Sequence, residues 1–224
     1  MAAGSKTAEP RKRVPAAERR DALIEAAMHE FARGGLHGTK VSQVARAVGV
    51  AQPYVFALFP TKADLFLAAV RRGFERIEAI FEAAAERYAE EGPAEPDEDV
   101  LLSIGRSYFN SLSAERDLLL LQLQAYAACE EKEIQIAVRR LYAGVIEKAR
   151  LLSDADDERL DEFFRGGMWL NVAAALGVDD LSEKSDWVKA IARGSSDVVR
   201  TWSRTATSSP SPRSWRPPRA APRL

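Results

Sequence analysis

The sequence predicts an all-α protein of about nine helices, and three observations carry this prediction. Apolar residues recur three and four positions apart along most of the 224 residues, and the interruptions fall mostly at glycine, proline or serine. No stretch alternates apolar and polar residues as a strand would. With 46% hydrophobic and 29% charged residues, the chain can bury a full core. The expected order is an N-terminal unit of three helices, one long helix and a larger helical body.

The N-terminal unit follows a basic segment. Residues 1–14 lack a hydrophobic period and contain the run Arg11-Lys12-Arg13, so we interpret them as a flexible basic arm. Apolar residues at helical spacing then predict an amphipathic helix over 16–33, and Gly34-Gly35 should end it.

Two short helices are expected next, over 41–48 and about 51–58. Gly49 between them can adopt the positive φ of a tight turn, and Ala45 is small where the two backbones approach. Pro53 falls in the first turn of the second helix, where its missing N–H costs little. This spacing is typical of a helix-turn-helix, and a plain helical hairpin with a glycine turn is the alternative.

The second short helix is expected to expose Gln52 and Tyr54 at its N-terminal end, next to the basic arm. A plain hairpin does not explain these two side chains, whereas a helix-turn-helix uses such positions to reach base edges or phosphates. We therefore interpret residues 15–65 as a helix-turn-helix DNA-binding domain with its motif at about 40–59.

A long helix is predicted from the Pro60-Thr61 break to about Glu91. Thr61 is placed as its N-cap, and Asp64 lies three residues on, in an acidic first turn. This helix should join the N-terminal domain to the body. Its apolar stripe comprises Leu65, Phe66, Val70, Phe74, Ile77, Phe81, Ala84 and Tyr88.

The body, residues 66–200, continues the helical pattern. Its run from Leu118 to Leu123 is apolar on nearly all sides and is expected at the centre of the body. The tail, residues 201–224, holds five Pro, five Ser and five Arg, so it is expected to be disordered and basic. It either stays solvated without function or adds non-specific attraction to nucleic acid. Further helices are predicted over about 97–112, 115–129, 131–152, 157–176 and 184–200.

The charge is unevenly distributed along the chain. The net formal charge is +4 over residues 1–65, −11 over 66–199 and +6 over 200–224. A basic head on an acidic body indicates an anionic partner for the head, and chance variation of a solvated surface is the alternative.

Composition narrows the protein class. The single cysteine, Cys129, allows no internal disulfide, no apolar run is long enough to cross a bilayer, and a signal peptide is absent, so we expect a cytoplasmic protein. A helical-bundle enzyme is an alternative, but both histidines, His29 and His37, lie outside the body and no Glu-x-x-His pair occurs. Because a phosphate loop and a nucleophile elbow are also absent, we expect no enzyme activity, cofactor or metal.

Residues 17–77 resemble the TetR family of one-component transcriptional regulators. The segment 24–31 resembles the family's first helix, and 35–41 resembles its loop into the second helix. The segment 44–50 matches the scaffold of the motif, and 55–65 is similar to the stretch that ends the recognition helix and opens the fourth helix. The resemblance implies an all-α fold in which a three-helix DNA-binding domain is joined by a long helix to a ligand-binding and dimerisation domain.

Three positions depart from the family's usual residues. Phe56 stands where an aromatic hydroxyl is usual and Leu58 where histidine is frequent, so phosphate contacts from those groups are lost. Lys40 stands where a small hydroxyl residue is common, which exchanges a cap for a charged phosphate contact. The residues at positions 56 and 58 keep open an alternative function, a dimeric helical interaction module without specific DNA binding.

The resemblance and the residue chemistry together assign roles in DNA binding. Gln52 is expected to read a base, Pro53 to stiffen its turn and contact a thymine methyl, and Tyr54 to reach a base edge or a phosphate. Residues at helix beginnings are expected to contact phosphates, with capping or a solvated charge as their alternatives. These are Thr39, Lys40 and Lys62; in the arm, Arg11 and Arg13 could enter a minor groove or stay solvated.

The resemblance further implies a homodimer that blocks transcription at an inverted-repeat operator and is released by an unknown small-molecule effector. The last two helices would form the dimer interface through a stripe that also fits an internal core, namely Phe164, Gly167, Met168, Asn171, Ala174 and Ala175. The acidic body favours a cationic or neutral apolar effector, and the long helix from Thr61 would couple the effector to the DNA-binding domain. The effector candidates, each of which also fits as core, are Phe74, Tyr108, Phe109, Gln124, Tyr126, Cys129, Tyr142 and Trp169.

Overall fold

The structure, a computed structural model, describes residues 15–96, 98–112 and 115–177. The all-α prediction is confirmed for these ranges, which contain eight α-helices, one short 3-10 helix and no strand. The predicted arm, the predicted helix over 184–200 and the predicted tail lie outside the described residues. The helices are α1 (Ala16–Gly38), α2 (Val41–Val48), α3 (Gln52–Leu58), α4 (Lys62–Glu91), α5 (Val100–Leu112), α6 (Arg116–Ala127), η1 (Ala128–Glu130), α7 (Lys132–Ser153) and α8 (Asp157–Leu176).

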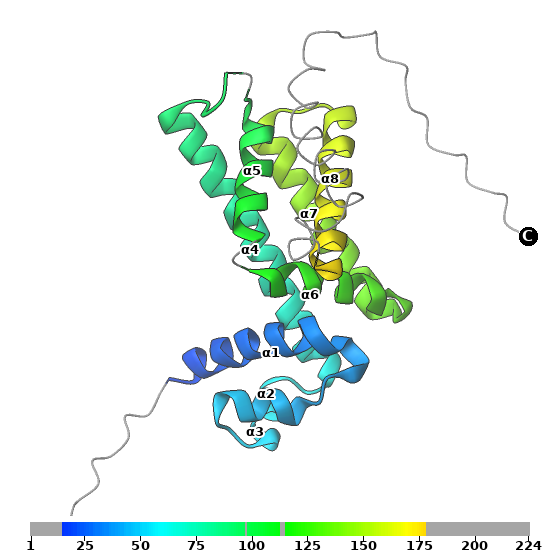
Figure 1. Cartoon of the computed structure of the whole chain (residues 1–224). Helices are drawn as coiled ribbons and strands as arrows, with labels where there is room; N and C mark the ends of the chain where they lie inside the picture. Colours follow the sequence, from blue (N-terminus) through cyan, green and yellow to red (C-terminus); the bar gives the residue numbers. More distant parts are fainter. Residues whose placement is uncertain (1–14, 97, 113–114, 178–224) are drawn as a thin grey trace, which may run out of the picture.

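The helices form a head and a body joined by α4 (Figure 1). Helices α1, α2 and α3 make the head, with α3 at the end remote from the body. Helix α4 starts in the head and runs into the body, where it packs with α5 and α7. Helix α6 lies at the base of the body and packs against α1 as well as α8. The head therefore packs on the body mainly through α4 and α6, and His37 of α1 also lies 3.3 Å from Glu130 of η1.

Helix α1 contains a kink at the point where the sequence predicts an interruption. Gly35 adopts the non-helical values φ 61° and ψ −175°, which confirms the predicted break at Gly34-Gly35, and a further helical segment that was not predicted continues as far as Gly38. Such a backbone conformation is accessible essentially to glycine alone. Gly35 is also buried, and a Cβ placed on it would lie 2.4 Å from Oε1 of Gln124 in α6. The kink thus lets the end of α1 approach α6 closely.

One continuous apolar core extends from the head into the body. In the head, the rings of Phe31 and Phe66 pack edge to face with centroids 5.0 Å apart, and both are fully buried. In the body, the Phe81 ring packs in the same way on Tyr108 and Phe163. Since these rings come from four helices, α1, α4, α5 and α8, the core holds the head, α4 and the body together.

The leucine-rich part of α6 is buried, but its position differs from the prediction. Leu118 and Leu121 pack over Gly73 of α4, where a Cβ would come within 3.3 Å of Leu118 Cδ1. Because α6 also packs extensively on α1, the run lies at the junction of head and body rather than at the centre of the body. A helix segment that is apolar on nearly all faces must be packed on nearly all faces, and the head supplies one of the packing partners here.

The predicted stripe of α4 is confirmed from Leu65 to Ala84, whereas Tyr88 is only half-buried.

Taken singly, none of the described helices has the length and hydropathy to cross a membrane; only α3 and α4 together, bent by 70°, would pass on those two criteria.

Candidate nucleic-acid interface and cavity of the body

Helices α2 and α3 have the geometry of a helix-turn-helix. Gly49 adopts φ 71° and ψ 33°, as the turn requires, and the Val50 N–H donates to the carbonyl of Ala45 at 2.9 Å. Val44, Ala45 and Val55 are buried between the helices and the rest of the head. The positive φ predicted for Gly49 is confirmed, and Ala45 is buried at the turn.

The N-terminal end of α3 presents the predicted base-contacting side chains. Gln52 and Pro53 are exposed, and Pro53 lies in the first turn of the helix as expected. Tyr54 is half-buried, and the guanidinium of Arg19 from α1 lies 5.9 Å from its ring centroid. The neighbouring Arg20 lies 4.8 Å from the Phe59 ring in the same manner. Two basic side chains of α1 are thereby held beside the helix-turn-helix.

Arg19 and the exposed Arg46 of α2 are basic groups near the motif that were not among the predicted contacts. The adjacent pair Arg19-Arg20, close to the basic arm, was the available signal for Arg19. Helical periodicity alone could not show that α1 crosses beside α3, because that crossing depends on tertiary packing.

The three predicted phosphate contacts are in different situations. Thr39 is 3% exposed and its hydroxyl donates to the carbonyl of Glu30 at 3.0 Å, so we remove Thr39 from the candidates. Lys40 is exposed, and Oε1 of Gln43 caps its backbone N–H at 2.9 Å. The Gln43 N–H, which a hydroxyl at position 40 would accept, donates to the carbonyl of Lys40 at 2.9 Å, so the Lys40 ammonium takes no part in capping.

The third predicted contact, Lys62, donates from Nζ to the carbonyl of His37 at 3.0 Å. This bond holds the start of α4 against the end of α1, and an ammonium retains two further donors for a phosphate. The predicted cap at the same point is confirmed, because the Asp64 N–H donates to the Thr61 hydroxyl at 3.1 Å and the Thr61 N–H donates to Asp64 at 2.9 Å.

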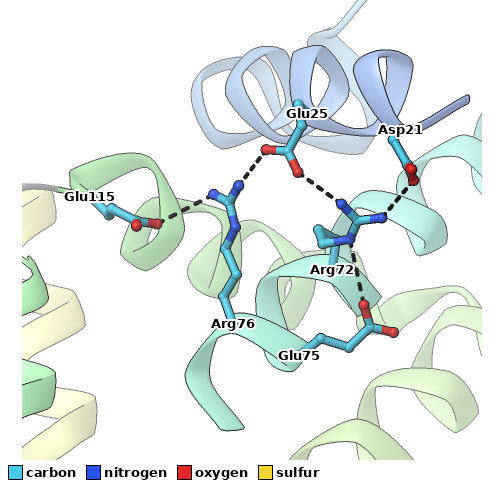
Figure 2. Close-up of polar contacts among 6 residues, drawn as sticks. All are labelled: Asp21, Glu25, Arg72, Glu75, Arg76 and Glu115. Atoms are coloured by element: carbon cyan, nitrogen blue, oxygen red, sulfur yellow. Dashed lines mark hydrogen bonds and ion pairs between the residues drawn. The ribbon is translucent and has the colours of Figure 1, made fainter. Parts of the chain in front are cut away.

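A cluster of ion pairs joins α1, α4 and the start of α6 (Figure 2). Arg72 donates to Glu25 at 3.0 Å and to Asp21 at 2.8 Å, and the hydrogen bond to Asp21 raises the pKa of Arg72. Arg76 donates to the same Glu25 at 2.5 Å and to Glu115 at 3.3 Å. We refer to these five residues as the junction cluster.

The junction cluster was not predicted, although a signal for it exists. On each of α1 and α4, two like charges stand four residues apart and so share one helix face, the acidic pair on α1 and the basic pair on α4. Nearby, His29 Nδ1 of α1 lies 2.5 Å from Asp117 Oδ2 of α6. These contacts link α1 of the head to α4 and α6.

A small cavity of about 30 Å³ lies in the body, between α4, α5, α6, α7 and α8. Four of the predicted effector residues line it: Phe74, Tyr108, Tyr126 and Tyr142. The other four do not. Phe109 is 52% exposed, Gln124 contacts α1 at Gly35, and neither Cys129 nor Trp169 borders the cavity. Instead, the half-buried thiol of Cys129 donates a hydrogen bond to the carbonyl of Ala125 at 3.3 Å, and burial raises its pKa.

Four residues of the predicted dimer stripe also line the cavity: Phe164, Gly167, Met168 and Asn171. Asn171 is 2% exposed within one chain, so its side chain cannot contact a second copy and we remove it from the predicted interface. The carbonyl of Ala174 accepts two hydrogen bonds from Arg116, while Ala175 is exposed. For Asn171, the position inside the core of the body, which was the alternative to the dimer interface, is therefore the one observed.

The remaining lining residues were not among the predicted effector contacts: Ile77, Phe81, Gln122, Val145 and Phe163. Gln122 is the most informative of them. It lies within the leucine run and is buried, and its Nε2 donates to the Tyr108 hydroxyl at 2.9 Å. Its Oε1 is 3.4 Å from both Tyr126 Oη and Asn171 Nδ2, which donate to it. A lone amide inside an apolar run was the signal that could have found it.

Every residue that lines the cavity is uncharged. Burial raises the pKa of Tyr108 to about 12 and also raises the pKa values of Tyr126 and Tyr142, so these phenols stay protonated at neutral pH. Within the part of the chain that the structure describes, no group of three or more His, Cys, Asp or Glu side chains could hold a metal ion.

The sequence matches to known proteins lie in the head of this chain. Residues 23–69 match the family model described as bacterial regulatory proteins, tetR family. The HTH-type transcriptional regulator RutR of Escherichia coli K12 is 34% identical over 67 residues, which are 30% of this chain and 31% of RutR. RutR of Shigella flexneri aligns with the same figures. This chain thus spans less than a third of the length of these curated relatives.

Solved structures match most of the chain in fold. The transcriptional regulator FadR from Bacillus subtilis, solved with stearoyl-CoA, has a TM-score of 0.60 at 17% identity, over 81% of this chain and 96% of that one. The fatty acid degradation regulator FadR from Bacillus halodurans has a TM-score of 0.60 at 19% identity, over 88% and 99% of the two chains. A TetR-like regulator from Rhodococcus sp. RHA1 has a TM-score of 0.55 at 18% identity, over 87% and 98%. At these identities the likeness concerns the fold.

Proposed function

We propose that this chain, whose residues 23–69 match the family model of bacterial regulatory proteins, tetR family, is a sequence-specific DNA-binding transcriptional regulator of that family. The observation that carries the proposal is the exposed N-terminal end of α3, which presents Gln52 and Pro53 at the end of the molecule remote from the body. An exposed amide at the start of a recognition helix suits hydrogen bonding to a base edge in the major groove.

The phosphate contacts that accompany base reading would come from basic groups around the motif. Lys40 and Arg46 are exposed on or beside α2, and Lys62 opens α4. Arg19 lies against the Tyr54 ring, close to the start of α3. Such contacts set affinity and register without specifying sequence, so binding should weaken steeply as salt rises.

The regulator would act as a homodimer on an inverted repeat. A two-fold dimer presents two copies of α3 to successive turns of the major groove, and its operator must share that symmetry. The exposed Ala175 and Leu176 at the end of α8 would contribute to the interface. With its DNA target in the bacterial chromosome, such a regulator would work in the cytoplasm.

Repression would be relieved by a small molecule in the cavity of the body. Two of the five helices around the cavity, α4 and α6, are also the ones that hold the head. A ligand larger than the present cavity must move side chains on these helices, and the junction cluster and the His29–Asp117 contact would pass that movement to α1. The ligand releases DNA only if it binds the non-operator state more tightly.

Selection of bound DNA from a random duplex library at two salt concentrations tests the proposal. An enriched inverted repeat, with affinity that falls steeply in salt, is the expected result. Salt-sensitive binding without an enriched motif would contradict sequence-specific reading. The absence of any binding would instead favour a helical interaction module, which the unusual Phe56 and Leu58 had left open.

A further inference from the structure

The cavity of the body contains a buried hydrogen-bond acceptor without a partner. Oδ1 of Asn171 has no hydrogen-bond partner and negligible solvent exposure, and the residue borders the cavity. Leaving such a group unsatisfied costs about 1–3 kcal/mol, so its retention calls for a partner that the chain itself does not supply.

The other polar groups near this acceptor are hydrogen-bonded to one another. The Asn171 amide nitrogen donates to Gln122 Oε1, which also accepts from the Tyr126 hydroxyl. Gln122 Nε2 in turn donates to the Tyr108 hydroxyl. With Gln122 oriented so that its Nε2 donates to Tyr108, reversing the Asn171 amide would face two amide oxygens against each other, so in this arrangement Asn171 Oδ1 is the acceptor that is left over beside the cavity.

The walls around this acceptor exclude charge. All thirteen residues that line the cavity are uncharged, and most of them are aromatic or aliphatic. An ion placed there would lose its hydration without gaining an opposite charge, at a cost of several kcal/mol. The lining therefore favours a neutral occupant over the cationic one that the acidic body had also allowed.

We infer that the effector of this chain is a compact, uncharged molecule, aromatic or aliphatic in its body, with a hydroxyl or N–H group that donates to Asn171 Oδ1. The inference rests on the proposed function only in calling the occupant an effector. The present cavity of about 30 Å³ holds about two water molecules, so a ligand must enlarge it. Half-buried Tyr142, Phe164 and the flexible Met168 form the side that can give way.

Three probes of nearly the same shape separate the contribution of the donor. Phenol carries a hydroxyl donor, anisole carries only an acceptor, and toluene carries neither. Binding of each to the full-length protein without DNA would be measured by isothermal titration calorimetry. We expect phenol to bind about tenfold more tightly than anisole or toluene, the change that one buried hydrogen bond brings. Benzoate and benzylammonium, matched in size but charged, should bind more weakly than phenol.

The variant Asn171→Leu locates the effect. It removes the acceptor at similar volume and should abolish or reverse the preference for phenol over toluene. Gln135→Leu, which changes an amide on α7 away from the cavity, should retain the wild-type preference. If Asn171→Leu fails to fold, the ranking of the three neutral probes on the wild type still decides the matter.

Equal affinity for phenol and toluene, preference for a charged probe, or no binding of any probe would overturn the inference; the last result would mean that the cavity holds water only. Because these titrations contain no DNA, they are independent of the operator selection. A protein that binds phenol through Asn171 but selects no DNA motif would refute the proposed function alone.

Discussion

Glu25 of α1 accepts a hydrogen bond from Arg76 of α4 at 2.5 Å, although the two residues are 51 positions apart in the sequence. The same carboxylate accepts from Arg72, and Arg76 reaches on to Glu115 beside α6 (Figure 2). One acidic side chain of the head thus holds two arginines of the long helix. The orientation of the head on the body depends on this contact together with the apolar core beneath it.

Replacing Glu25 by Gln should weaken this junction. The change removes the charge that two guanidinium groups share, and the side chains are about 30–40% exposed, so the free energy of unfolding should fall by about 1 kcal/mol or less. Urea unfolding in low and in high salt measures it, and the loss should shrink in high salt. Glu75→Gln, which removes only a neighbouring pair within α4, is the matched control and should cost less. An equal loss in both variants would contradict a special role for Glu25.

The kink in α1 should not tolerate a side chain. Gly35→Ala forces φ 61°, ψ −175° on a residue with a Cβ and should cost about 1–3 kcal/mol of unfolding free energy. Gly38→Ala is the control, because a Cβ there meets nothing within 4 Å, and thermal unfolding should leave it near the wild type. Adding Gln124→Ala to Gly35→Ala removes the 2.4 Å contact but not the backbone strain. Full rescue by that second change would show that the contact, not the backbone, carries the cost.

Two substitutions in the head should affect DNA binding differently. Gln52→Ala should relax sequence preference at one position per half-site, because it removes a base contact, at a cost of about 1–3 kcal/mol on the preferred sequence. Lys62→Ala should weaken binding to all sequences alike and lower the salt dependence, as the loss of a phosphate contact does. Competition binding on single-base variants of the selected operator distinguishes the two. Uniform loss across sequences for Gln52→Ala would exclude it as a base reader.

Alkaline pH should destabilise the body through its buried phenols. Burial raises the pKa of Tyr108 from 10 to about 12, so its contribution is complete below pH 10 and is lost as the pH rises toward 12, where the unfolded chain ionises first. Urea unfolding between pH 9 and 11 should show a falling free energy of unfolding. In Tyr108→Phe this fall in the free energy of unfolding should be shallower, by about 1 kcal/mol between pH 9 and 11. An unchanged slope in the variant would mean that Tyr108 ionises at its ordinary pKa in the folded chain.

The helix-turn-helix could be recognised from the sequence because its determinants are local. The left-handed turn at Gly49, the small Ala45, the exposed Gln52 and the Thr61–Asp64 cap each depend on residues within a few positions of one another. Helical periodicity likewise depends on neighbours three and four residues apart, and most predicted helix limits agree with the structure to within three residues.

The cavity and the junction were decided by tertiary packing. Nothing local indicates that Asn171, Gln122 and Tyr108 meet, since they come from α8, α6 and α5, and the aromatic residues Phe109 and Trp169 share their helical pattern without bordering the cavity. The contact of Gly35 with Gln124 and the burial of the Thr39 hydroxyl have the same origin, because each depends on what packs against the residue. Sequence by itself determined the helices and the reading motif through short-range backbone preferences. Only the folded chain decided which polar groups face one another, because those contacts join residues that are far apart along the chain.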